Sequence, residues 1–192
     1  MELSQSSETI PSVIPFSRQV SDAVCINLKR RPERWAAFES RACAAGLASI
    51  RRFEAIDGND LNLPDNLKSH RGAYGCLHSH AAVYKEALAN GCSHIFVAED
   101  DCIFTPDAIG VTDYLAATLG TYSWIHFGGS RSCYAEGVRD CATHREVARV
   151  LNTHAYVIDR TLMSGYVEAL EADPFPKSEV LHADRLILHL CR

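Results

Sequence analysis

Short apolar runs alternate along this chain with longer segments in which apolar residues recur at helical spacing. Short runs bounded by turn residues are typical of strands, and they lie at residues 23–28, 50–56, 94–98, 123–127, 147–151 and 154–158. The helical spacing predicts helices over residues 32–45, 72–89, 107–119, 161–170 and 183–190. Strands that alternate with helices indicate an α/β fold with a mostly parallel sheet and helices on both faces.

The first 20 residues lack this patterning. They carry polar side chains and two prolines without periodicity, so we expect a mobile tail at residues 1–20. Residues 21–192 are enough for one compact domain with a sizeable core.

Composition narrows the class of protein. The net charge of −5 provides no basic surface for nucleic acid and no polybasic membrane patch. None of the eight cysteines forms a C-x-x-C pair, which argues against a zinc ribbon and for a reducing compartment. We find no apolar run of transmembrane length and no signal-peptide pattern. We therefore expect a cytoplasmic protein, with peripheral association at the inner membrane as the alternative.

Three consecutive carboxylates, Glu99, Asp100 and Asp101, follow the apolar run at residues 94–98. Adjacent carboxylates repel one another, and a divalent cation that also binds substrate phosphate oxygens would relieve the repulsion. Ligands of open α/β sheets bind beyond the carboxyl ends of strands, where this triplet lies. The alternative is a solvated acidic turn before the helix near Asp107, because anions are favourable at a helix N-terminus.

A basic turn ends the first predicted strand, with Asn27 followed by Lys29, Arg30 and Arg31. In a parallel sheet this turn and the acidic triplet lie at the same edge and face one crevice. A diphosphate bridged to a metal needs such a mixture, since acids hold the ion and Arg neutralises phosphate. A solvated loop is the alternative interpretation.

Gly72 and Gly75 open the long predicted helix. Glycines at a helix N-terminus can admit an anionic ligand close to the backbone, but they can also mark a close contact between helix and strand. Asp184 lies at the start of the last helix. A carboxylate is favourable at a helix N-terminus, so this position alone does not require a functional role.

The histidines give no two-histidine metal motif. His78 and His80 are two positions apart and cannot share a helical face, so we expect only one of them to face the crevice. We interpret His126, His144 and His154 as structural.

Several segments together resemble glycosyltransferase family 25, which includes lipooligosaccharide and collagen galactosyltransferases. The resemblance lies in residues 26–34 (INLKRRPER), 53–58 (FEAIDG), 72–80 (GAYGCLHSH) and 97–101 (VAEDD), and more weakly in 154–158 (HAYVI) and 183–184 (AD). These pieces occur in the order seen in the family and cover most of residues 23–186.

The resemblance implies a GT-A-like domain that transfers a hexose, often galactose from UDP-galactose, with inversion and with Mn²⁺ or Mg²⁺. The acceptor would be a glycan or glycoconjugate such as lipopolysaccharide. It implies Asp101 as the main metal ligand and a catalytic residue, Asp100 as a second ligand, and Asp184 as the general base. The implied nucleotide-sugar contacts are Asn27, Arg30, Arg31, Gly72, Gly75, His80, Glu99 and Asp100.

This chain departs from the family pattern in places. Ala98 replaces a bulkier apolar residue, and the chain ends soon after Asp184, so we expect part of the acceptor site to be absent or supplied by a second subunit of a homo-oligomer. Residues 129–146 match nothing in the family, and we expect them to help choose the acceptor.

Three rival functions can be stated. A catalytically degenerate sugar-nucleotide-binding or scaffold protein would keep the same fold, and a metal-dependent phosphohydrolase or nucleotidyltransferase could use the same crevice. A phosphoryl-receiver module is disfavoured because Lys29, Arg30 and Arg31 stand where it requires an acidic pair.

Overall fold

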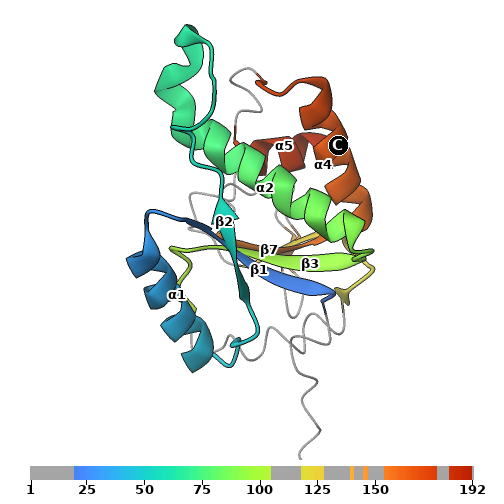
Figure 1. Ribbon diagram of the computed structural model, residues 1–192. Helices are drawn as coiled ribbons and strands as arrows, with labels where there is room; N and C mark the ends of the chain where they lie inside the picture. Colours follow the sequence, from blue (N-terminus) through green and yellow to red (C-terminus); the bar gives the residue numbers. More distant parts are fainter. Residues whose placement is uncertain are drawn as a thin grey trace, which may run out of the picture.

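The computed structural model describes residues 20–104, 118–127, 154–176 and 182–191, and the backbone of two short strands at 139–140 and 145–146. A five-stranded open sheet in the order β2-β1-β3-β7-β4 forms its centre (Figure 1). Its strands are β1 (Asp22–Leu28), β2 (Arg51–Ala55), β3 (His94–Glu99), β4 (Trp124–His126) and β7 (Ala155–Asp159). The short strands β5 (Arg139–Asp140) and β6 (Arg145–Glu146) pair separately. The predicted tail at 1–20 (except its last residue), most of the helix at 107–119 and the strand at 147–151 lie outside the described residues.

The sheet is mixed rather than mostly parallel. β1 pairs in parallel with both β2 and β3, whereas β7 pairs antiparallel with both β3 and β4. The α/β class is therefore confirmed, but the parallel arrangement holds only for β2, β1 and β3. Strand direction depends on the path of the connections, which hydrophobic periodicity does not encode.

Helices cover both faces of the sheet, as the sequence predicts (Figure 1). One face carries α1 (Pro32–Ala44) and the other carries α2 (Arg71–Ala89), α4 (Arg160–Ala172) and α5 (Ala183–Leu190). A short 3₁₀ helix, η2 (Asp65–His70), precedes α2 within a segment for which the sequence predicts only a loop.

Local signals explain where these helices begin and end. Pro32 occupies the first turn of α1, where its fixed φ fits and its missing N–H is not needed. Gly91, with φ of 76°, follows α2 in the left-handed conformation that commonly ends helices. Asp159 caps α4 by accepting a hydrogen bond of 2.8 Å from the Leu162 N–H.

The central strand β3 contributes to two cores. Ile95 and Val97 pack into the cluster beneath α2 and α4, whereas Phe96 and Ala98 pack into the cluster beneath α1. All four side chains are buried, which confirms the prediction of a strand buried on both faces. This burial holds the acidic triplet rigidly at the end of the strand.

Helix α2 makes its closest backbone approach at Gly75. A Cβ on Gly75 would lie 2.7 Å from the Gly58 nitrogen and 2.8 Å from the Ile56 carbonyl oxygen. The adjoining Ser79 Oγ accepts a 2.8 Å hydrogen bond from the Ile56 N–H. A Cβ on Gly72 would meet no atom within 4 Å. Gly75 therefore lets α2 pack closely against the turn after β2. This agrees with the interpretation that the glycine marks a close contact, rather than a site for an anionic ligand.

Gly75→Ala should destabilise the fold by about 1–3 kcal/mol, since backbone on both sides of the new methyl group would have to move. Gly72→Ala is the matched control and should be neutral or stabilising by up to about 1 kcal/mol. Urea denaturation of both variants measures the difference. Equal midpoints would show that the approach at Gly75 is not tight.

Candidate functional site

The turns after β1 and β3 meet at one edge of the sheet. The parallel register places Ile26 beside Glu99, and the Asn27 side-chain amide donates a 2.6 Å hydrogen bond to Asp100 Oδ2. The same amide donates to the Arg31 carbonyl oxygen at 3.1 Å. The basic and acidic turns therefore lie side by side, as a parallel pair of strands predicts.

Asp100 joins three elements. Its carboxylate is largely buried, with Oδ2 held by Asn27 and Oδ1 lying 2.6 Å from Arg34 Nη2 on α1. Its backbone carbonyl accepts a 3.0 Å hydrogen bond from Arg41 Nη2. Because both carboxylate oxygens already have partners, Asp100 ties β1, α1 and the end of β3 together.

Asp101 has a different environment. Its side chain is 49% exposed, compared with 9% for Asp100. Its Oδ1 lies 3.2 Å from His154 Nδ1 and its Oδ2 lies 3.2 Å from Arg34 Nη2. Asp101 therefore faces the open side of the site, whereas Asp100 faces the protein.

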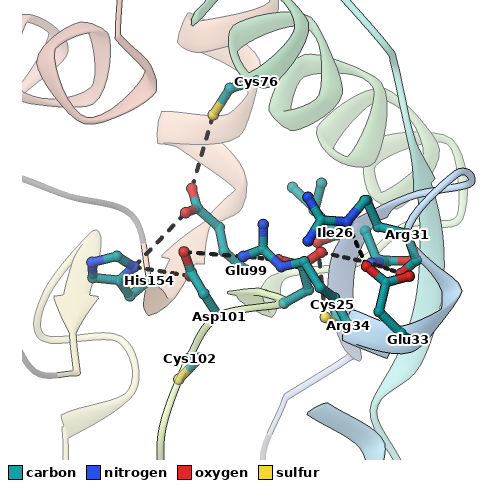
Figure 2. Close-up of polar contacts among 12 residues, drawn as sticks. Cys25, Ile26, Arg31, Glu33, Arg34, Cys76, Glu99, Asp101, Cys102 and His154 are labelled. Carbon is teal, nitrogen blue, oxygen red and sulfur yellow. Dashed lines mark hydrogen bonds and ion pairs between the residues drawn. The ribbon is translucent and has the colours of Figure 1, made fainter. Parts of the chain in front are cut away.

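His154 joins Glu99 and Asp101 at this edge. Its Nδ1 lies 3.8 Å from Glu99 Oε2, and the Glu99 N–H donates to the His154 carbonyl at 2.9 Å. One ligand atom from each of the three side chains lies within 4.8 Å of the others. Figure 2 shows His154 beside both carboxylates. The sequence indicated no partner for His154, and the antiparallel pairing of β7 with β3 brings this histidine to the acidic end of β3, beside two carboxylates.

The arginines of the basic turn have partners of their own. Arg30 Nε lies 2.5 Å from Asp57 Oδ2, and Arg31 Nε lies 2.5 Å from Glu33 Oε1. The Asn59 N–H and then the Arg30 guanidinium lower the pKa of Asp57. Neither of these two ion pairs involves the acidic triplet.

Arg34 reaches the acids instead, and sequence reasoning missed it. Its guanidinium contacts Asp100 and also Asp101, as Figure 2 shows. The usable signal was its place two residues after Pro32, in the first turn of a helix whose N-terminus follows the basic turn.

A buried group lies behind Glu99. Cys76 Sγ donates to Glu99 Oε1 at 3.8 Å, and His80 Nε2 lies 3.5 Å from the same oxygen. His80 is fully buried, and its Nδ1 is 2.6 Å from the Tyr156 hydroxyl, which in turn lies 2.5 Å from the Tyr84 hydroxyl. His80 therefore points into the protein beneath Glu99. His78 instead contacts the Pro174 carbonyl at 3.0 Å, so the two histidines occupy different faces as expected.

Asp184 lies on the Cys76 side of the site. It is buried in the first turn of α5, where Oδ1 accepts from the Arg185 N–H at 2.9 Å. Burial raises the pKa of the Cys76 thiol, and the carboxylates of Glu99 and Asp184 raise it further. The Asp184 carboxylate therefore acts electrostatically on the buried group behind Glu99.

Gly72 and Gly75 lie in the first two turns of α2, and Gly75 serves packing against Gly58. In the part of the chain that the structure describes, no helix is both long and apolar enough to cross a membrane.

Residues 21–136 match the model of a known protein family, glycosyltransferase family 25 (LPS biosynthesis protein). A protein of Aedes aegypti named "Glycosyltransferase 25 family member" is 29% identical to this chain over an alignment of 144 residues. The match covers 64% of this chain. The aligned region spans 23% of that relative's own length. The matched segment includes the basic turn, the acidic triplet, Cys76 and the buried His80.

Proposed function

Because this chain belongs to glycosyltransferase family 25, we propose that it is a metal-dependent, inverting hexosyltransferase with a GT-A-like domain. The donor we propose is UDP-galactose, and the acceptor is a glycan such as lipopolysaccharide. The observation that carries the proposal is the convergence of Glu99, Asp101 and His154 with the Arg34 guanidinium where β1 and β3 end. A cytoplasmic location and a homo-oligomeric state stay predictions of the sequence.

The residues present fit a hard divalent ion. Carboxylate oxygens suit Mn²⁺ or Mg²⁺, and Glu99 and Asp101 supply them, with the His154 imidazole as a third donor. When bound, such an ion holds both phosphates and neutralises the charge that develops as the nucleoside diphosphate leaves. Asp100, with both oxygens engaged by Asn27 and Arg34, positions this group rather than joining it.

The arginines would receive the remaining phosphate charge. Arg30 and Arg31 have side chains 56% and 42% exposed, and such exposed ion pairs contribute about 0–1 kcal/mol. Exchanging these pairs for a bidentate contact with phosphate therefore costs little. Asn27 holds the Arg31 carbonyl and so sets the position of the turn.

One-step inversion needs a base that takes the proton of the acceptor hydroxyl. We assign this role to Asp184, whose carboxylate lies close enough to Cys76 to raise the pKa of that thiol. Gly72, where a Cβ would meet nothing, leaves the start of α2 open to a donor. His80 lies behind Glu99, with Nε2 3.5 Å from Oε1.

Thermal unfolding with a panel of nucleoside diphosphates and nucleotide sugars, with and without Mn²⁺, tests the proposal. A ligand at about 100 times its Kd should stabilise the fold by roughly 2.7 kcal/mol. For a chain of this size that raises Tm by about 5 °C or more. We expect this rise with UDP or a UDP-sugar only when Mn²⁺ is present. No response to any nucleotide would overturn the assignment of the crevice.

A further inference from the structure

We propose that Cys76, His80 and Glu99 form a second metal site, distinct from the exposed group at Asp101 and His154, that takes a thiophilic divalent ion such as Zn²⁺. The three side chains place one sulfur, one nitrogen and one oxygen within 4.8 Å of one another. This mixed set of donors is one that Zn²⁺ accepts readily. The proposal goes beyond glycosyl transfer and requires no nucleotide or acceptor.

The spacing on α2 brings the sulfur and the nitrogen together. Cys76 and His80 are four positions apart, so they lie on one face of the helix. That face meets the end of β3, where Glu99 Oε1 lies 3.8 Å from the sulfur and 3.5 Å from Nε2. Ligand bonds of about 2.3 Å to sulfur and 2.0–2.1 Å to nitrogen and oxygen imply tetrahedral edges of about 3.3–3.6 Å. The two separations from Glu99 Oε1 need only a small contraction to reach these values, and the sulfur and Nε2 lie within 4.8 Å of each other.

His80 Nε2 is the observation that points to a ligand. His80 is fully buried, and this nitrogen forms no hydrogen bond within the described part of the chain, with Glu99 Oε1 outside normal bonding distance at 3.5 Å. Leaving a buried polar atom without a partner destabilises the fold, because the atom loses its hydrogen bonds to water. A metal ion between Nε2, the thiolate and the carboxylate would remove that cost.

The other side of the imidazole is already arranged for this role. His80 Nδ1 lies 2.6 Å from the Tyr156 hydroxyl, which continues to Tyr84. A metal-bound histidine usually donates its second N–H to an oxygen, which fixes the ring and its tautomer. With Nδ1–H donated to Tyr156, the Nε2 lone pair faces Cys76 and Glu99.

Glu99 separates the two donor groups. Oε1 lies 3.5 Å from His80 Nε2. Figure 2 shows Glu99 between Cys76, which contacts Oε1, and His154, which lies beside Oε2. The buried side offers a thiol and an imidazole, and the exposed side adds a second carboxylate. Soft ligands favour Zn²⁺ and carboxylate-rich ones favour Mn²⁺ or Mg²⁺, so the two sites should select different ions.

Co²⁺ titration of the metal-free full chain tests the site, because a thiolate bound to Co²⁺ gives an intense charge-transfer absorption. We expect one such band per chain, displaced by one equivalent of Zn²⁺ and absent in Cys76→Ser. Cys43→Ser removes an exposed thiol on α1 and serves as the matched control that keeps the band. A wild-type chain without the band, or a band lost in Cys43→Ser and kept in Cys76→Ser, would overturn the proposal.

Two further measurements keep the result independent of how well Cys76→Ser folds. X-ray absorption of the zinc-loaded wild type should show one sulfur at about 2.3 Å with nitrogen and oxygen ligands at about 2.0–2.1 Å. Tyr156→Phe should weaken Zn²⁺ binding by about 10–100-fold through loss of the contact to His80. A sulfur-free coordination shell, or unchanged affinity in Tyr156→Phe, would contradict the site. Neither measurement uses turnover, so this proposal can fail while glycosyl transfer holds.

Discussion

Asp101→Asn is expected to lower the turnover of a nucleotide sugar by about 100-fold or more, because a catalytic metal supplies several kcal/mol of charge stabilisation. The side chain is half exposed and faces both His154 and Arg34. The amide keeps the size of the carboxylate but loses the charge that holds the ion. Since exposed ion pairs contribute little, the free energy of unfolding should stay within about 1 kcal/mol of wild type.

Asp60→Asn, at an exposed position in the turn before η2, is the matched control and should leave metal-dependent binding unchanged. Calorimetric titration of UDP in the presence of Mn²⁺ gives the affinity of each variant. If Asp101→Asn bound UDP with the full effect of Mn²⁺, Asp101 would not be a metal ligand.

The neighbouring substitution, Asp100→Ala, should instead destabilise the fold by about 3 kcal/mol. The change leaves the Asn27 amide and the Arg34 guanidinium without their shared carboxylate. Removing one partner of a buried ion pair costs about 3–5 kcal/mol, and we take the lower end because the Arg34 side chain is one third exposed.

Urea denaturation of Asp100→Ala and Asp101→Asn side by side measures this difference. We expect a clearly lower midpoint for Asp100→Ala alone, with an unchanged slope. Equal midpoints for the two variants would mean that Asp100 does not tie α1 to the sheet.

Local patterns were sufficient for the parallel half of the sheet and for the edge that carries the site. The apolar run before Glu99, the basic turn after Leu28 and the rule that parallel strands end together predicted that these turns meet. The hydrogen bond between Asn27 and Asp100 confirms that juxtaposition. Each of these signals lies within one short segment.

Contacts between segments far apart in the chain could not be predicted from the sequence. His154 reaches Asp101 because β7 runs antiparallel to β3, and no periodicity in residues 154–158 indicates that direction. The different environments of Asp100 and Asp101 depend on where Arg34 of α1 packs. Sequence adjacency made these two carboxylates look equivalent, whereas burial separates them.

The buried group behind Glu99 shows the same limit. Cys76 and His80 are four positions apart in the sequence, but this spacing does not indicate which residue packs opposite them. Only the packing of α2 on β3 reveals that the sulfur, the imidazole and Glu99 converge.

Product analysis of UDP-galactose incubated with the protein, a panel of glycan acceptors and Mn²⁺ tests metal-dependent sugar transfer most directly. The reaction is stopped with EDTA and the phosphorus products are identified by ³¹P NMR. We predict UDP as the product, formed only when both acceptor and metal are present. Release of galactose 1-phosphate, together with UMP or with a uridylated acceptor, would indicate a hydrolase or a nucleotidyltransferase instead. Binding of the donor without any product across the acceptor panel would contradict transfer and favour a scaffold of the same fold.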